Sequence, residues 1–250
     1  LGTIAFSHNT AGGIGSLYEP FGALDTPYLY RDVDHLMKVM DVNSPVMQEL
    51  NQGLIEAANA RVIYAHYFGR RNLTANKAVY KPEDLAGEKI RSVPFPIYQT
   101  AIEGMGAAPV PVDWSEVPTA LATGVVAGQE NPVNVILNVK LYEVQSHLML
   151  TGHMSNAEVV VMSEDAWQTL SDDQKQAIEA ASLEIRERAT KAIQDNEEKE
   201  TEELRKLGMT VIGPEDGLEI DAFRASVQKL VDERFGEKYG DLYDKIRAIA

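Results

Sequence analysis

One unbroken helical pattern constrains the fold of this chain more than any other feature. Charged and apolar residues alternate at helical spacing over residues 172–207. Ser171 and Gln174 have the spacing of a capping box, and Gly208 marks an end for the helix. Because this pattern is longer than an ordinary globular helix, it predicts an element that bridges two lobes.

Strands and shorter helices alternate before this long helix, and the strands end in polar side chains. Residues 3–6 predict a buried first strand, with Asn9 in the polar stretch that follows it. Residues 61–65, 125–132 and 156–162 predict further strands. Since ligands of α/β proteins often sit at strand ends, the pattern predicts a cleft between two α/β lobes. We expect the lobes to be joined by crossing segments near 68–70 and near Asn156.

Two arginines are candidates for binding an anion in such a cleft. Arg91 lies where an apolar strand gives way to the proline-containing bend at Val93 and Pro94, and Arg71 lies in a polar extended segment. A guanidinium held at a strand end can grip a carboxylate through two parallel hydrogen bonds. Either arginine could instead be a surface residue or one partner of a salt bridge.

The charge balance limits the partners that the chain can have. Lys and Arg number 23 against 38 Asp and Glu, which gives a formal net charge of −15. This argues against a nucleic-acid partner or an anionic membrane surface. An anionic ligand would therefore have to be attracted by local donors inside a shielded cleft.

Sequence motifs for catalysis, metals and cofactors are missing from the chain. It has no cysteine, no Walker phosphate loop, no HExxH and no GxSxG. The glycine-rich residues 12–16 predict a turn with positive φ rather than a phosphate cradle. The five histidines are scattered, although His8 and His153 follow strands and could edge a cleft. We therefore expect no catalytic residue, metal or cofactor.

Several linked motifs resemble the solute-binding proteins of TRAP transporters, the DctP-type periplasmic receptors. These motifs are AGEKIRSVP at 86–94, GAAPVPVDWSEV at 106–117, TALATGVVAGQENP at 119–132, KLYEVQ at 140–145, LTGH at 150–153 and LDTPYLYRD at 24–32. The resemblance implies a two-lobed, periplasmic-binding-protein-like α/β fold of type II character. It also implies a periplasmic receptor that closes on a small organic acid and delivers it to a membrane permease.

The resemblance also assigns pocket residues. It implies that Arg91 is the arginine that pairs with the ligand carboxylate, that Arg71 is a second pocket arginine, and that Asn131 is the pocket asparagine. Trp114 takes the place of an aromatic side chain that packs against the ligand. With the strand-end candidates, the predicted binding residues are Asn9, Arg71, Arg91, Trp114, Asn131, His153 and Asn156.

The expected domain division follows from the predicted crossing segments. Lobe I comprises residues 1–68 and 157–195, and lobe II comprises residues 69–156 and 196–250. Family members usually carry a further N-terminal segment, so the resemblance implies that lobe I is truncated. We expect a monomer rather than a dimer. An enzyme acting on a small organic acid and a sensor ectodomain with the same fold stay open as alternatives, and the identity of the acid stays open too.

Overall fold

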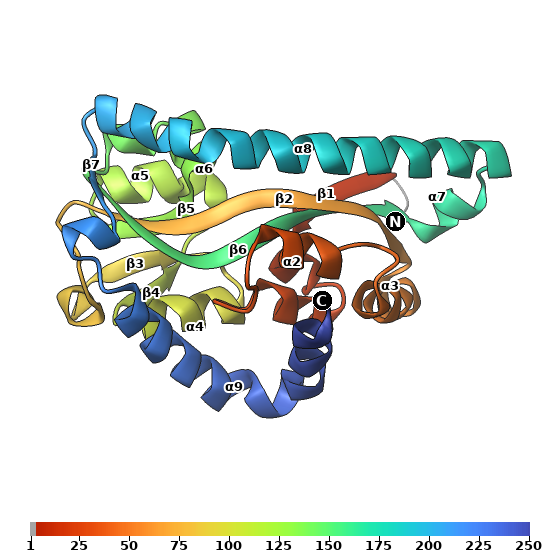
Figure 1. Ribbon diagram of the computed structural model, residues 1–250, viewed down its shortest axis with the longest axis horizontal. Coiled ribbons are helices and arrows are strands. Elements are labelled where there is room, and N and C mark those ends of the chain that lie inside the picture. Colours follow the sequence, from red (N-terminus) through yellow and green to blue (C-terminus); the bar gives the residue numbers. More distant parts are fainter. Residues whose placement is uncertain (1–3) are drawn as a thin grey trace.

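The computed structural model describes residues 4–250 as an α/β fold built on one seven-stranded sheet (Figure 1). The sheet order is β1-β6-β2-β5-β3-β4, and β7 pairs with β6 outside this path. The pairs between β6 and both β1 and β2 are antiparallel, as is β2 with β5, whereas β3 runs parallel to β4 and β5. The strands are β1 (Phe6–Thr10), β2 (Ala60–Ala75), β3 (Lys89–Ser92), β4 (Ala108–Pro111), β5 (Gly128–Pro132), β6 (His147–Ser163) and β7 (Thr210–Ile212).

Helices lie on both sides of the sheet. Figure 1 shows α8 running along one side of β2 and β6, while α2, α3, α4 and α9 lie on the other. No helix within residues 4–250 combines the length and the apolar character that crossing a membrane requires. The α-helices are α1 (Ala11–Ile14), α2 (Val33–Val39), α3 (Pro45–Ala58), α4 (Pro96–Gly104), α5 (Val117–Ala122), α6 (Val133–Asn138), α7 (Glu164–Gln168), α8 (Asp172–Lys206) and α9 (Ile220–Ala248). Short 3-10 helices are η1 (Glu19–Asp25), η2 (Pro82–Leu85), η3 (Trp114–Glu116), η4 (Leu141–Glu143) and η5 (Pro214–Asp216).

The predicted long helix is confirmed as α8. Ser171 Oγ accepts a hydrogen bond from the Gln174 backbone at 3.3 Å, and Gln174 Oε1 accepts one from the Ser171 backbone at 2.9 Å. Gly208 follows the helix with a φ of 100°, a conformation that glycine adopts at little cost. Local sequence therefore sets both ends of this element.

The strands β2 and β6 are longer than the sequence predicts. Pairing runs from Ala60 opposite Ser163 to Ala75 opposite His147, with register shifts on the way. The predicted strand at 61–65 is confirmed as part of β2, but its predicted end is wrong, because backbone pairing with β6 continues through the polar residues to Ala75. Gly69 lies opposite Asn156 in the irregular part, and its φ of 128° strongly favours glycine.

The prediction of a buried strand at residues 3–6 is wrong for Ile4 and Ala5, which are in no strand, and Phe6 begins a strand that is exposed. Thr3 lies outside the described residues. The strand is β1, and Ser7, His8 and Asn9 pair with β6 instead of following a strand. Most of β1 is exposed. Backbone hydrogen bonding to β6, rather than apolar character, therefore defines this strand.

The apolar core consists of separate clusters that share β2 and β6. The first cluster includes Tyr67 of β2 and Ala157 of β6, and the second includes Leu73 and Met154 of the same strands. The change between clusters thus falls in the region where the sequence predicts the crossing segments. The helix α9 contributes to both clusters, and its residues Tyr239, Tyr243 and Ile246 pack in the first. The exact lobe boundaries stay a prediction.

Candidate functional site

A cavity of about 560 Å³ opens where the parallel strands β3 and β5 end. Five predicted binding residues line it: Asn9, Arg71, Arg91, Trp114 and Asn131. The other two, His153 and Asn156, are fully buried and lie behind this wall. The remaining lining residues are His8, Thr10, Phe68, Val93, Tyr98, Asn134, Val135, Asn138, Val139 and Glu158.

Arg91 is a buried cation without a charged partner. It is only 3% exposed, and it forms no ion pair with any residue of the described range 4–250. Its Nε donates a hydrogen bond to the Val112 carbonyl oxygen at 3.0 Å, which fixes the guanidinium. Burial lowers the pKa of Arg91 from its ordinary 12.5 to about 10, so the side chain stays protonated at neutral pH.

Trp114 forms an exposed apolar wall next to this cation. Its side chain lies on η3 and is 41% exposed, so it is not part of the core. The guanidinium carbon of Arg91 lies 5.7 Å from the Trp114 ring centroid, within the range of a cation–π interaction. The ring can thus cover one side of a ligand that approaches Arg91.

Arg71 differs from Arg91 because a carboxylate of the protein neutralises it. Its Nε donates to Oε2 of Glu130, and its Nη2 donates to Glu130 Oε1 at 2.9 Å and to Asn131 Oδ1 at 3.0 Å. The guanidinium carbon also lies 5.1 Å from the Tyr98 ring centroid. Nη1 of Arg71 donates no hydrogen bond to any residue that the structure describes. Arg71 therefore brings little net charge to the cavity.

Glu130 is held ionised by its neighbours although it is fully buried. His153 Nε2 lies 3.2 Å from Glu130 Oε2, and His153 Nδ1 lies 2.8 Å from Thr151 Oγ1. Burial alone would raise the pKa of Glu130, but Arg71 and His153 lower it to about 2. Glu130 was not among the predicted site residues. A charged residue within an otherwise uncharged strand was the available signal, because such a group requires a counter-charge.

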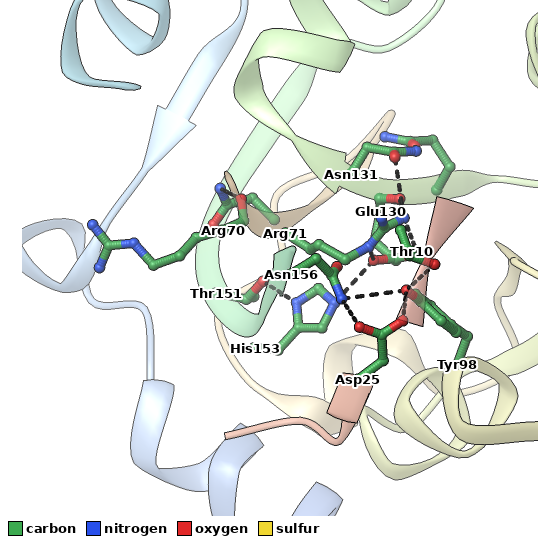
Figure 2. Close-up of polar contacts among 12 residues, drawn as sticks. Thr10, Asp25, Arg70, Arg71, Tyr98, Glu130, Asn131, Thr151, His153 and Asn156 are labelled. Carbon is green, nitrogen blue, oxygen red and sulfur yellow. Dashed lines mark hydrogen bonds and ion pairs between the residues drawn. The ribbon is translucent and has the colours of Figure 1, made fainter. Parts of the chain in front are cut away.

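A second buried carboxylate, Asp25, joins distant segments behind the cavity. Figure 2 shows the side chains of Asp25, Tyr98 and Asn156 converging. The Tyr98 hydroxyl donates to Asp25 Oδ2 at 2.7 Å, and Asn156 Nδ2 donates to Asp25 Oδ1 at 2.6 Å. Burial raises the pKa of Asp25, while the donated hydrogen bonds oppose that effect. Neither Asp25 nor Tyr98 was among the predicted site residues.

The glycine-rich segment contacts the buried carboxylate of Asp25 and does not form a left-handed turn. The backbone N–H of Gly12 donates to Asp25 Oδ2 at 2.6 Å. A Cβ at Gly12 would lie 2.9 Å from both that oxygen and the Tyr98 ring, so no other residue fits without movement. The predicted positive φ at residues 12–16 is wrong, because these glycines belong to the α1 region and have negative φ.

Two of the asparagines that line the cavity, Asn131 and Asn9, also bond to the protein. Asn131 Nδ2 donates to Gln129 Oε1 at 2.5 Å, and Asn9 Oδ1 accepts from the Thr10 backbone at 2.9 Å. These bonds set the direction in which each amide faces the cavity. Within residues 4–250, no group of three or more His, Asp or Glu side chains is arranged to hold a metal ion.

The fold and the cavity together define a ligand-binding protein of the α/β receptor class. The sequence matches the model of the DctP family, bacterial extracellular solute-binding protein family 7, over residues 1–238. The chain therefore belongs to the DctP family of TRAP periplasmic solute-binding proteins, as the sequence predicts. Membership in this family of receptors also confirms that the chain is not an enzyme.

Relatives of known structure share the whole fold. The chain is 32% identical to a TRAP periplasmic solute-binding protein from Bordetella bronchispeptica, with a TM-score of 0.90, over 100% of this chain and 81% of that one. A TRAP protein from Polaromonas sp. JS666 bound to D-erythronate is 30% identical, with a TM-score of 0.89, over 99% and 79%. The sialic acid-binding periplasmic protein SiaP of Vibrio cholerae is 31% identical over 93% of this chain and 71% of its own length. The predicted α/β receptor fold and the periplasmic location are confirmed by these similarities.

Proposed function

We propose that this protein is an extracytoplasmic receptor that binds a small organic acid in the cavity beside Arg91. We further propose that it delivers this acid to the membrane subunits of a TRAP transporter. The relatives named above bind sialic acid and D-erythronate, both of which carry a carboxylate. The single observation that carries the proposal is the buried guanidinium of Arg91, which has no ion-pair partner among residues 4–250.

A ligand carboxylate would supply the counter-charge that Arg91 lacks. The Nε of Arg91 donates to the Val112 carbonyl, whereas its two terminal nitrogens donate to no residue of the described range 4–250 and can donate to a ligand in the cavity. Two parallel bonds from a planar guanidinium fix both the position and the orientation of a carboxylate. Trp114, Asn131 and Asn9 would then contact the body of the ligand.

The remaining predicted residues have supporting roles in this proposal. Arg71 would offer Nη1 to the ligand while Glu130 holds the rest of its guanidinium. His153 would keep Glu130 in place, and Asn156 would do the same for Asp25. His153 and Asn156 would thus affect ligand binding indirectly, by holding Glu130 and Asp25 in place.

Closure of two lobes would couple binding to delivery. We propose lobe I as residues 1–68 and 157–195 and lobe II as residues 69–156 and 196–250, with β2 and β6 crossing between them. A ligand that contacts both lobes shifts the equilibrium toward the closed form by its differential affinity for that form. The membrane permease would recognise the closed form, and the receptor would act as a monomer.

A ligand screen with a charge-preserving variant tests the binding site. We expect one or more small carboxylates to raise the melting temperature of the wild-type protein, since a ligand that binds only the native state stabilises it. Arg91→Lys keeps the charge but loses the planar fork, so we expect the affinity measured by calorimetry to fall by about 2 kcal/mol, or roughly 30-fold. Arg61→Lys is the matched control, because Arg61 pairs with Glu164 away from the cavity.

Two outcomes would refute the proposal. One is a wild-type protein that no carboxylate of the screen stabilises. The other is an Arg91→Lys variant that binds as tightly as Arg61→Lys. Delivery is tested separately, by uptake of the identified acid into proteoliposomes that contain the permease, with and without the receptor.

A further inference from the structure

A carboxylate of the protein lines the same cavity in which we propose that an anion binds. Glu158 lies on β6, between Thr10 of β1 and His66 of β2 in the strand register. Its side chain is 13% exposed, and its Oε2 lies 3.2 Å from Nδ1 of His8, which also lines the cavity. The other oxygen, Oε1, accepts no hydrogen bond from any residue in the range 4–250.

Glu158 is not the counter-charge of either cavity arginine. Arg71 is paired with Glu130, and neither Arg71 nor Arg91 forms an ion pair with Glu158. Among the described residues that line the cavity, Glu158 alone is acidic. Among the residues that the structure describes, the cavity lining therefore carries one cation without an ion-pair partner, Arg91, and one carboxylate, Glu158, of which a single oxygen contacts His8.

The carboxylate of Glu158 favours a ligand group that donates a hydrogen bond and disfavours a ligand group that carries a second negative charge. Burial raises the pKa of Glu158, because it removes water from around the charged carboxylate. A donor on the ligand would restore a lost hydrogen bond, whereas a ligand carboxylate at this place would add repulsion between like charges in a poorly screened site.

Amide side chains that line the same cavity indicate which donor fits. Asn9, Asn134 and Asn138 line the cavity together with Glu158 and His8. A hydroxyl group can donate to Glu158 and at the same time accept from an amide N–H, whereas an ammonium group can only donate. The lining thus suits a hydroxyl better than an ammonium.

We propose that Glu158, positioned by His8, is a specificity-determining residue that recognises a hydroxyl group at the end of the ligand away from the carboxylate bound by Arg91. This inference rests on the proposed function, and it narrows the ligand class to hydroxylated monocarboxylates. The corresponding dicarboxylates, in which the terminal hydroxyl carbon is oxidised to a second carboxylate, are rejected.

Matched acid pairs provide the test. Calorimetry compares D-erythronate with meso-tartrate and L-galactonate with galactarate, because the members of each pair differ only in whether the far end is a hydroxyl or a carboxylate. Wild-type protein should bind at least one monocarboxylate about tenfold or more tightly than its dicarboxylate partner, the size of effect expected for one hydrogen bond to a charged group. Glu158→Gln removes the repulsion and should reduce this ratio about tenfold. Glu143→Gln changes the net charge equally at an exposed position outside the cavity and should leave the ratio unchanged.

The outcomes separate this inference from the proposed function. If acids bind and Arg91→Lys weakens them, but Glu158→Gln leaves the ratio at its wild-type value, the role of Glu158 is refuted and the receptor function stands. A wild-type preference for the dicarboxylates would refute the role as well. If none of the four acids binds, the inference is overturned, and the wider screen then decides the proposed function alone.

Discussion

Replacing Arg91 by methionine should stabilise the ligand-free protein, although the residue is almost completely buried. Arg91 is 3% exposed and has no ion-pair partner within residues 4–250. Burial lowers its pKa from 12.5 to about 10. At about 1.4 kcal/mol for each pKa unit, this difference corresponds to about 3 kcal/mol of free energy that opposes folding with the charge in place.

Two favourable contacts of Arg91 reduce the expected gain. The hydrogen bond from Nε to the Val112 carbonyl contributes about 1 kcal/mol, and the contact with the half-exposed Trp114 ring contributes about 0.5–1 kcal/mol. Methionine retains an unbranched apolar chain that can fill the space. We therefore expect the free energy of unfolding of Arg91→Met to exceed that of the wild type by about 1–2 kcal/mol.

Urea denaturation in the absence of ligand measures this difference, and Arg71→Met is the matched control. Arg71 is as buried as Arg91, but it neutralises Glu130. Removing it leaves a buried carboxylate without its counter-charge, so we expect a loss of about 3–5 kcal/mol. The same chemical change should thus have opposite signs at two arginines of one cavity.

The binding measurement completes the experiment. Arg91→Met should lose affinity for any carboxylate that binds the wild type, because the charge and the planar donors are both removed. A destabilisation of the ligand-free protein by more than about 1 kcal/mol in Arg91→Met would refute this prediction, since the guanidinium would then already be satisfied within the protein.

Two further changes probe the buried network behind the cavity. The pKa of Glu130 is lowered to about 2, so its contribution to stability is complete above its ordinary value of 4.5 and is lost as pH falls through about 2. Urea denaturation between pH 5 and pH 2 should therefore show the stability gap between the wild type and Glu130→Gln shrinking by about 3 kcal/mol, and a gap independent of pH would contradict this assignment. Tyr98→Phe removes a donor from the buried Asp25 carboxylate and should lower the free energy of unfolding by about 1–3 kcal/mol, whereas a change below about 0.5 kcal/mol would show that the 2.7 Å bond contributes little.

Local sequence was sufficient to predict the elements whose ends are fixed by adjacent residues. The helix α8 was predicted to within a residue, because a capping box and a glycine act over one turn of the chain. The strand that carries Arg91 was predicted for a similar reason, since apolar residues lead into a proline-containing bend. The family was identified from linked motifs whose order and spacing are visible in one chain.

Strand pairing could not be predicted from local sequence. The residues of β1 are polar and exposed, yet they form a strand because β6 supplies their hydrogen bonds. The strand β2 continues through Arg70 and Arg71 for the same reason. Figure 2 shows these two side chains pointing apart, and only the register with β5 and β6 decides which of them reaches the cavity.

The sequence by itself determined that this protein is an α/β solute receptor with an arginine at a strand end, because short sequence motifs indicate both properties. Only the tertiary structure decided which of the charged side chains at the cavity form ion pairs within the described residues. Arg71 lies 59 residues from Glu130 and is neutralised by it, while Arg91 has no ion-pair partner within the part of the chain that the structure describes. Glu158 reaches the cavity from a strand 150 residues beyond His8. Electrostatic interactions depend on distance and burial in the folded chain, and neither can be read from the spacing of residues along it.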